Sequence, residues 1–416
     1  MAYLLGVVLF ALAIFISVCL HEAGHMGTAK AFGMKVTRYF AGFGPTLWSF
    51  RRGETEYGLK AIPLGGFVKI VGMTPQDDDV APADQPRAMW RYPLWKRTVV
   101  MSAGSATHFV LGFVVLWLTL FLVGVPNPEA LDITRQPATI SVAPCVVATE
   151  DSAGCGPTDA PSPAKLAGLH DDDVITALDD KPIRSYDDLQ KAIRSAKYGP
   201  AMVTYQRDGA SEQTVVYLVP ASRRPLDQQD NPDAKPVDVP ALGVVYRIPP
   251  GVPTIVTYGP VDSLRQSGMY TGRVFAAMGG AIGRIPEKIP ALWNSLSGKP
   301  RDPNTPISVV GASRLGGETV EHGAWWLFLN ILITLNFFVG VFNLLPLLPL
   351  DGGHIAIAWF ERFRSWLYAR LHRPDPGRVN YLKLMPFTYA VILIFGGFTV
   401  LTVAADIVNP ITLFSK

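Results

Sequence analysis

Residues 3–25 read YLLGVVLFALAIFISVCLHEAGH, an uncharged apolar run that leads directly into two histidines and a glutamate. The run from Tyr3 to Leu20 is close to the roughly 20 apolar residues that cross a bilayer as a helix. If the helix continues through His21, Glu22 and His25, both imidazoles lie on one face, because positions i and i+4 are neighbours on a helix. Two such histidines can hold one zinc ion beside the glutamate. The stretch therefore predicts a membrane span that ends in a zinc site.

The rest of the chain has the composition of a membrane protein. Of its 416 residues, 49% are hydrophobic and 17% are charged, whereas soluble domains carry about 25% charged residues. Three further apolar runs can span a bilayer: Thr98 to Val125, Ala324 to Leu350 and Leu384 to Ala405. A purely soluble enzyme, a disordered chain and a coiled coil are poor interpretations, and a net charge of +3 gives no indication of a nucleic-acid partner. We expect a polytopic α-helical membrane protein with four transmembrane helices.

Basic residues predict its orientation. Eleven Lys and Arg lie between Lys30 and Arg97, and six lie between the third and fourth runs, at Arg362, Arg364, Arg370, Arg373, Arg378 and Lys383. Short basic loops face the cytoplasm, so both termini and the segment from Pro126 to Gly323 are expected to be extracytoplasmic. No Lys or Arg precedes the first run, which argues against a cleaved signal peptide. The predicted location is the cell membrane, crossed several times and in contact with its lipids.

The pattern divides the chain into four regions. Residues 1–125 hold the first two spans and, between them, two segments rich in aromatic and β-branched residues, Tyr39 to Trp48 and Tyr57 to Val71. The Arg51-Arg52-Gly53 turn between these segments predicts a β-hairpin. Its apolar side chains predict that the hairpin is membrane-associated. Residues 324–416 hold the third and fourth spans.

The two middle regions lack spans. Residues 126–250 predict an extracytoplasmic α+β domain with the architecture of a small mixed βαβ-like barrel. Its expected elements include a helix from Tyr186 to Ala196, capped by Ser185, and strands on both sides of Asp208-Gly209. Residues 251–323 predict an amphipathic linker on the membrane surface, interrupted by Pro and Gly. Cys145 and Cys155 could form a local disulfide in an oxidising compartment, although spacing alone leaves free thiols open.

A catalytic zinc site usually has three protein ligands, and Asp351 is the best third candidate. It lies in the segment NLLPLLPLDGGH at residues 343–354, where an acidic residue at the end of an apolar run needs a partner or a metal. The predicted orientation brings it to the same side of the membrane as His21 and His25. Glu54 and Glu56 are weaker candidates nearer in sequence. The plain alternatives are that Asp351 only forms a turn and that the histidines only end a helix.

These motifs, four spans and an external domain resemble the site-2 protease family of intramembrane zinc metalloproteases. The resemblance implies that His21, His25 and Asp351 bind Zn²⁺ and that Glu22 is the catalytic base. It also implies that Asn343 contacts the substrate or the transition state, and that the hairpin around Gly42 and Gly44 holds substrate as an extended strand. Family members cleave single-span membrane proteins such as anti-sigma factors in transmembrane signalling, in some cases after an upstream site-1 protease.

Two features leave alternatives open. Residues 160–220, with SPAKLAGLHDDDVITALDDKPI, are similar to one bacterial PDZ domain, which could bind a peptide or act as a size filter. The family's Gly-Pro-x-x-Asn motif is replaced by residues 104–108, GSATH, so that His108 is either an extra ligand or proton relay, or a polar side chain that packs among the spans. His354 is a candidate partner of the metal ligands. The remaining functional alternatives are an inactive PDZ adaptor and, with less support, a metal transporter.

Overall fold

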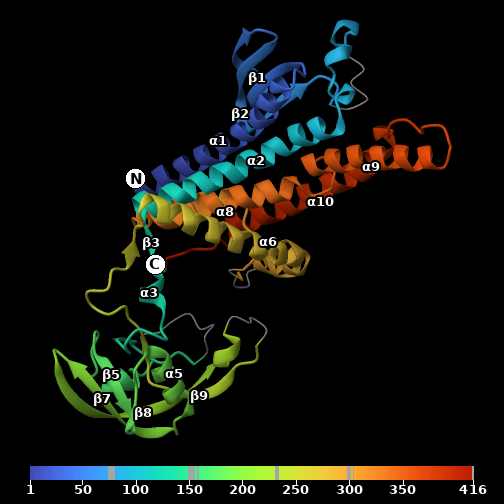
Figure 1. The fold of residues 1–416 in the computed structure, drawn as a ribbon. Coiled ribbons are helices and arrows are strands. Elements are labelled where there is room, and N and C mark those ends of the chain that lie inside the picture. The colour runs from blue at the N-terminus through green and yellow to red at the C-terminus, as the bar shows by residue number, and fades with distance from the viewer. Residues whose placement is uncertain are drawn as a thin grey trace. The chain divides into compact units, whose positions relative to one another are not determined.

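The computed structural model describes residues 1–73, 80–148, 155–156, 159–229, 234–297, 301–302 and 304–414. Its contacts divide the chain into two units (Figure 1). The helical unit comprises Met1–Val123 and Thr257–Lys416, and the strand unit comprises Gly124–Val256. The predicted zinc site belongs to the helical unit.

Among the described residues of the helical unit, four helices are long and apolar enough to cross a membrane. They are α1 (Ala2–Ala31), α2 (Leu94–Leu118, continued to Val123 by a π-helical turn), α8 (Trp325–Asn343) and α10 (Tyr381–Val408). In Figure 1, α1 and α2 run side by side, and α8 packs on α2. The predicted polytopic helical architecture is therefore confirmed in its four long apolar helices.

The third apolar run is not one helix. α8 ends at Asn343, and α9 (Asp351–Arg370) begins after a segment that contains Pro346 and Pro349. Proline lacks a backbone N–H and clashes with the preceding turn, which explains why the helix stops although the sequence stays apolar. Asp351 is thereby the first residue of a new helix.

The hairpin predicted between the first two spans is present. Strands β1 (Val36–Arg52) and β2 (Thr55–Ile70) pair antiparallel from Val36 opposite Ile70 to Arg52 opposite Thr55, and β2 packs along α1. Both strands are longer than predicted. The register shifts near Gly42 and Gly44, whose φ angles of 90° and 82° suit glycine. A side chain on Gly42 would also press against the Ile62 carbonyl. The hairpin is followed by two short 3₁₀ segments, Pro82–Arg87 and Met89–Arg91.

The predicted linker is more helical than its sequence indicates. α6 (Pro260–Leu296) is a single helix that runs through Pro286 and Pro290, where we expected interruptions. α7 (Val309–Glu321) was not predicted, because its glycines weaken any helical pattern. Those glycines allow close packing: a side chain on Gly316 would collide with Phe10 of α1.

The strand unit is an α+β domain in which every pairing among the described residues is antiparallel. The α+β class is therefore right, but the parallel pairing that the predicted βαβ-like arrangement implies is wrong for the described strands. Its main sheet has the order β6-β5-β7-β8-β9, and two short pairs join β10 to β4 and β11 to β3. The strands are β3 (Val125–Pro126), β4 (Ile140–Val142), β5 (Val174–Leu178), β6 (Lys181–Pro182), β7 (Gly199–Arg207), β8 (Ala210–Arg223), β9 (Val237–Ala241), β10 (Val244–Tyr246) and β11 (Ile255–Val256).

The strand unit also contains short helical segments, some of which contribute to its core. They are α3 (Pro128–Leu131), α4 (Pro163–Leu166), α5 (Tyr186–Ser195) and the 3₁₀ turn Leu226–Gln228. α5 begins as predicted, with Ser185 and Asp188 forming a reciprocal capping box. Leu189 of α5 is fully buried with Ile140, Ile175 and Val203 of the sheet. Cys145 and Cys155 form a disulfide, which resolves the alternative left open by their spacing.

Candidate metal centre

Three side chains from α1 and α9 converge inside the helical unit. The Nε2 atoms of His21 and His25 lie 3.1 Å apart, and each lies 3.3 Å from Oδ2 of Asp351. Both histidines are buried, and Asp351 is mostly so. Residues more than 300 positions apart in the sequence thus present three donor atoms to one point.

The separations suit a zinc ion. Donors about 2.0–2.1 Å from zinc in a tetrahedral arrangement lie roughly 3.3 Å from one another, close to the three distances observed. Asp351 Oδ2 is buried and accepts no hydrogen bond from the described residues. An unpaired buried carboxylate oxygen is costly, and a cation would satisfy it. The residues present therefore fit zinc, with a fourth position left for water or substrate.

The neighbouring helix α2 orients the imidazoles. Nδ1 of His25 donates to the Val100 carbonyl at 2.7 Å, which leaves its Nε2 lone pair free for a metal. Gly104 lies against both rings, where a side chain would collide with them. Sequence reasoning missed the roles of Val100 and Gly104. It singled out residues 104–108 only because GSATH replaces the family's Gly-Pro-x-x-Asn motif there.

Glu22 lies beside the three donors and is held by the hairpin. The backbone of Val68 in β2 faces its carboxylate. Gly66 of the same strand is so close that a Cβ there would lie 3.5 Å from Cγ of Glu22. Strand β2 thus positions the side chain that the sequence predicts as the base.

His108 also reaches this site from α2. Its ring centroid lies 5.1 Å from that of His21, and its Nδ1 lies 2.9 Å from Oδ1 of Asn336 in α8. Because the Asn336 amide nitrogen donates to Leu332, its oxygen faces His108, and Nδ1 of His108 is the donor. The sequence singled out His108 but not Asn336, which looks like any polar residue within a span.

The other predicted site residues lie in different settings. Asn343 is the partly exposed last residue of α8, and Gly42 and Gly44 form the irregular part of β1. His354 lies one turn after Asp351 and stacks on Tyr381 at 5.9 Å. Its Nδ1 is buried and has no partner among the described residues. The structure brings none of the four into hydrogen-bond contact with the three donors among the contacts it describes.

The alternative third ligands are used elsewhere. Glu54 forms a double hydrogen bond with Arg87 at 2.6 and 2.7 Å, and Glu56 accepts from Ser49. Neither belongs to the donor cluster, so Asp351 is the acidic residue that the fold supplies.

Comparison with protein families matches residues 9–373 to peptidase family M50, the site-2 protease family. The chain belongs to peptidase family M50. It is 44% identical to the zinc metalloprotease Rip1 of Mycolicibacterium smegmatis and 43% identical to Rip1 of Mycobacterium tuberculosis, each over the full length of both chains. Rip1 of Mycobacterium bovis is likewise 43% identical over both full lengths.

Membership in the M50 family agrees with the site. The chain is a zinc metalloendopeptidase with several membrane-spanning helices, and its family acts on membrane substrates in regulated proteolysis. The predicted family, enzyme class and Zn²⁺ cofactor are confirmed.

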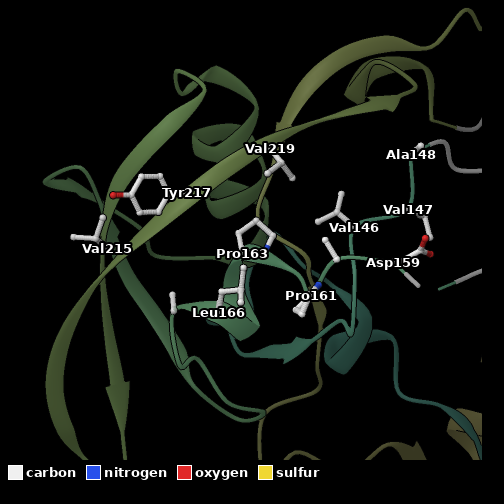
Figure 2. A pocket seen from close by; sticks show the side chains of 12 residues that line it. Val146, Val147, Ala148, Asp159, Pro161, Pro163, Leu166, Val215, Tyr217 and Val219 are labelled. Carbon is white, nitrogen blue, oxygen red and sulfur yellow. The ribbon is translucent and has the colours of Figure 1, made fainter. Parts of the chain in front are cut away.

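The strand unit has a separate concave surface. An apolar groove of about 790 Å³ lies between α4, β8 and the segment after Cys145. Figure 2 shows Val215 and Tyr217 of β8 on one side, Val146 to Ala148 on the other, and Leu166 and Pro163 between them. Leu166 and Tyr217 are well exposed.

Proposed function

We propose that this M50 peptidase hydrolyses peptide bonds within or near the transmembrane segment of single-span membrane proteins. The observation that carries the proposal is the donor cluster of His21, His25 and Asp351, buried within α1 and at the start of α9. These three residues are the zinc ligands of the proposal. A zinc ion held there supplies a Lewis acid and lowers the pKa of bound water.

The chain's own residues divide the remaining work. Glu22 takes the proton of the attacking water on its carboxylate and returns it to the leaving amine, while strand β2 packs against its side chain at Gly66. Val100 holds the His25 ring through Nδ1. Asn343 is assigned a contact with the substrate backbone near the scissile bond, and His354 supports the start of α9 beside Asp351.

Strand β2 is the proposed guide for the substrate. A transmembrane helix conceals its backbone amides and must unwind before it can be cut. The hairpin beside Glu22 offers strand hydrogen bonds to such a segment, and the irregular backbone at Gly42 and Gly44 leaves room for it. Non-helical backbone at membrane depth is tolerated where it lines a cavity.

The proposed orientation has the metal centre near the cytoplasmic side, with both termini and the strand unit outside the cytoplasm. The excess of Lys and Arg in the two short connections supports it. The disulfide between Cys145 and Cys155 also supports an oxidising location for the strand unit.

The strand unit is proposed to be PDZ-like and to receive the external part of a substrate. Its apolar groove supports docking rather than mere exclusion by size. Replacing Tyr217 with Asp should then slow cleavage of a substrate with an external segment more than cleavage of one without it. Equal effects on both substrates would exclude docking in this groove.

The substrate class follows from the family rather than from the site. Anti-sigma factors with one span, trimmed first by a site-1 protease, fit a buried centre that admits one unwound helix. The competing function is an inactive membrane-bound adaptor, which would have no use for a base beside the metal.

The deciding experiment compares wild type with Glu22→Gln on a model single-span substrate in detergent, with zinc counted in both. Glu287→Gln, at an exposed position of α6, is the control. We expect zinc in all three proteins and a loss of about 10²–10⁴-fold in cleavage only for Glu22→Gln. Full turnover by Glu22→Gln would contradict the assignment of the base. Zinc without cleavage in any protein, across several substrates, would favour the adaptor.

A further inference from the structure

One half of helix α9 carries large apolar side chains that stay well exposed in the described structure. Its exposed members lie between 38 and 57% accessible and recur at helical spacing, so at about 100° per residue they share one face. We call this surface the α9 face; it consists of Trp359, Phe360, Phe363, Trp366, Leu367 and Leu371. An exposed aromatic surface of this kind marks a binding site.

The position of α9 in the chain says what lies beside this face. α8 and α10 are both candidate spans and α9 lies between them, so the two ends of the connection from Leu344 to Asn380 lie on the same side of the membrane. Tryptophan is enriched where a bilayer meets water, because its ring is apolar and its N–H is polar. The α9 face is thus placed at a lipid boundary.

The charge of the same connection is unbalanced. Its two carboxylates outside the metal centre are engaged within the protein: Glu361 accepts from the Val379 N–H, and Asp375 accepts from Ser365 and from the Gly377 N–H. Within the described chain, no carboxylate lies within 4 Å of the guanidinium groups of three exposed arginines on or next to the α9 face, Arg362, Arg370 and Arg373.

Aromatic and basic groups are also combined locally. The Arg370 guanidinium stacks over the Trp366 ring at 5.1 Å, and Arg364 lies over Phe360 at 5.7 Å while donating to the Gly377 carbonyl. Such stacking holds a guanidinium at the boundary between apolar surface and water. From there it can donate two hydrogen bonds to a phosphate.

We propose that the α9 face and Arg362, Arg370 and Arg373 form a docking surface for anionic phospholipid headgroups. The aromatic side chains enter the interfacial layer, and the three arginines bind the lipid phosphates. A second copy of the chain is a poorer occupant, because three uncompensated arginines would meet their own copies or a neutral surface.

The α9 face and the metal centre share one helix. Asp351 is the first residue of α9, and a side chain on Gly352 would overlap the Leu344 carbonyl, so this end of the helix is tightly seated. Further along, the Trp359 indole N–H donates to Thr98 of α2 at 3.1 Å. Lipid bound along α9 therefore fixes Asp351 relative to His21 and His25. This consequence rests on the proposed function, and it makes cleavage depend on anionic lipid.

The test measures lipid binding and cleavage separately, on the full-length protein. The triple variant Arg362→Gln/Arg370→Gln/Arg373→Gln is compared with wild type and with Arg265→Gln/Arg273→Gln/Arg284→Gln, which removes three exposed arginines from α6. Phosphatidylglycerol retained per chain is measured by native mass spectrometry. Cleavage is measured in nanodiscs of phosphatidylcholine with and without phosphatidylglycerol.

We expect the α9 variant to bind phosphatidylglycerol more weakly by on the order of a hundredfold, and to lose the acceleration that this lipid gives wild type. The α6 control and an Arg-to-Lys version of the α9 triple variant should keep both. If the α9 and α6 variants retain equal amounts of phosphatidylglycerol, the proposed docking surface is wrong. It is also wrong if the α9 variant changes its oligomeric state without a change in the phosphatidylglycerol retained per chain. Unequal retention with identical cleavage would overturn the link to Asp351. If wild type cleaves nothing in any lipid, the proposed function fails, while retention still decides the surface.

Discussion

Two clusters of buried polar side chains in the helical unit differ in how many of their hydrogen bonds are made. Arg301 and Asp406 form an ion pair at 2.6 Å, with side chains 2 and 1% exposed. The other oxygen of Asp406 accepts from the backbone and hydroxyl of Ser308, and the guanidinium also donates to Thr305 and Pro306. In the metal centre, by contrast, Asp351 Oδ2 and His21 Nδ1 have no hydrogen-bond partner in the described chain.

The contrast separates a structural cluster from a functional one. A buried charge whose hydrogen bonds are all made fixes the elements around it, here α7, the preceding segment and the end of α10. A buried cluster whose polar atoms lack hydrogen-bond partners destabilises the fold. This destabilisation is offset only when a ligand such as a metal ion binds to the cluster. The two clusters should therefore respond differently to mutation.

The largest expected effect concerns the satisfied cluster. Asp406→Asn leaves the Arg301 guanidinium buried without its counter-charge, which should cost about 3–5 kcal/mol of stability. The apparent melting temperature in detergent should fall, while zinc content and cleavage per folded molecule stay the same. Replacing both partners, Arg301→Met with Asp406→Leu, should recover much of the loss. An unchanged melting temperature for Asp406→Asn would show that the pair contributes little.

A smaller effect is expected at the edge of the metal centre. Asn336→Leu removes the acceptor that holds the His108 ring beside His21. Supporting partners of metal ligands are typically worth 10–100-fold in metal affinity or activity, and we expect a loss in that range by chelator competition and cleavage. Asn330→Leu on the same helix is the control, since Asn330 bonds Tyr270 instead. Equal effects of the two substitutions would assign His108 to packing alone.

The smallest effect lies outside the four long apolar helices, next to the hairpin turn. The double hydrogen bond from Arg87 holds the pKa of Glu54 below its usual range. A lowered pKa contributes stability above the ordinary value of 4.5, and this contribution is lost as pH falls through the folded-state pKa. As the pair is exposed, it is worth at most about 1 kcal/mol.

Thermal unfolding of wild type and Glu54→Gln between neutral and acidic pH checks this prediction. The melting temperatures should differ at neutral pH and converge below the ordinary glutamate pKa. A difference that does not depend on pH would mean that Glu54 acts through packing rather than charge.

Sequence reasoning found the groups whose chemistry is unusual at their position. The i, i+4 histidines, Glu22 and Asp351 stand out because charged and ionisable residues are rare within apolar runs. The four spans and the hairpin follow from composition and turn residues. The candidate zinc site could therefore be predicted from two distant motifs and the orientation that the basic residues indicate.

The groups that were missed depend on which helix faces meet. Val100 acts through its backbone carbonyl, Gly104 acts by lacking a side chain, and Asn336 is one of several polar residues in its span. None of these roles leaves a mark in a single sequence. The same holds for α6, which continues through Pro286 and Pro290 although the sequence predicts interruptions there.

Zinc retention in two matched variants tests the central claim most directly. Asp351→Asn and Asp406→Asn make the same small change in the unsatisfied and the satisfied cluster, and each purified, monodisperse protein is assayed for bound zinc against a competing chelator. We predict that Asp351→Asn loses more than about 100-fold in zinc affinity, beyond the range typical of supporting partners, while Asp406→Asn keeps the wild-type affinity. Wild-type affinity in Asp351→Asn would contradict the assignment of the metal centre.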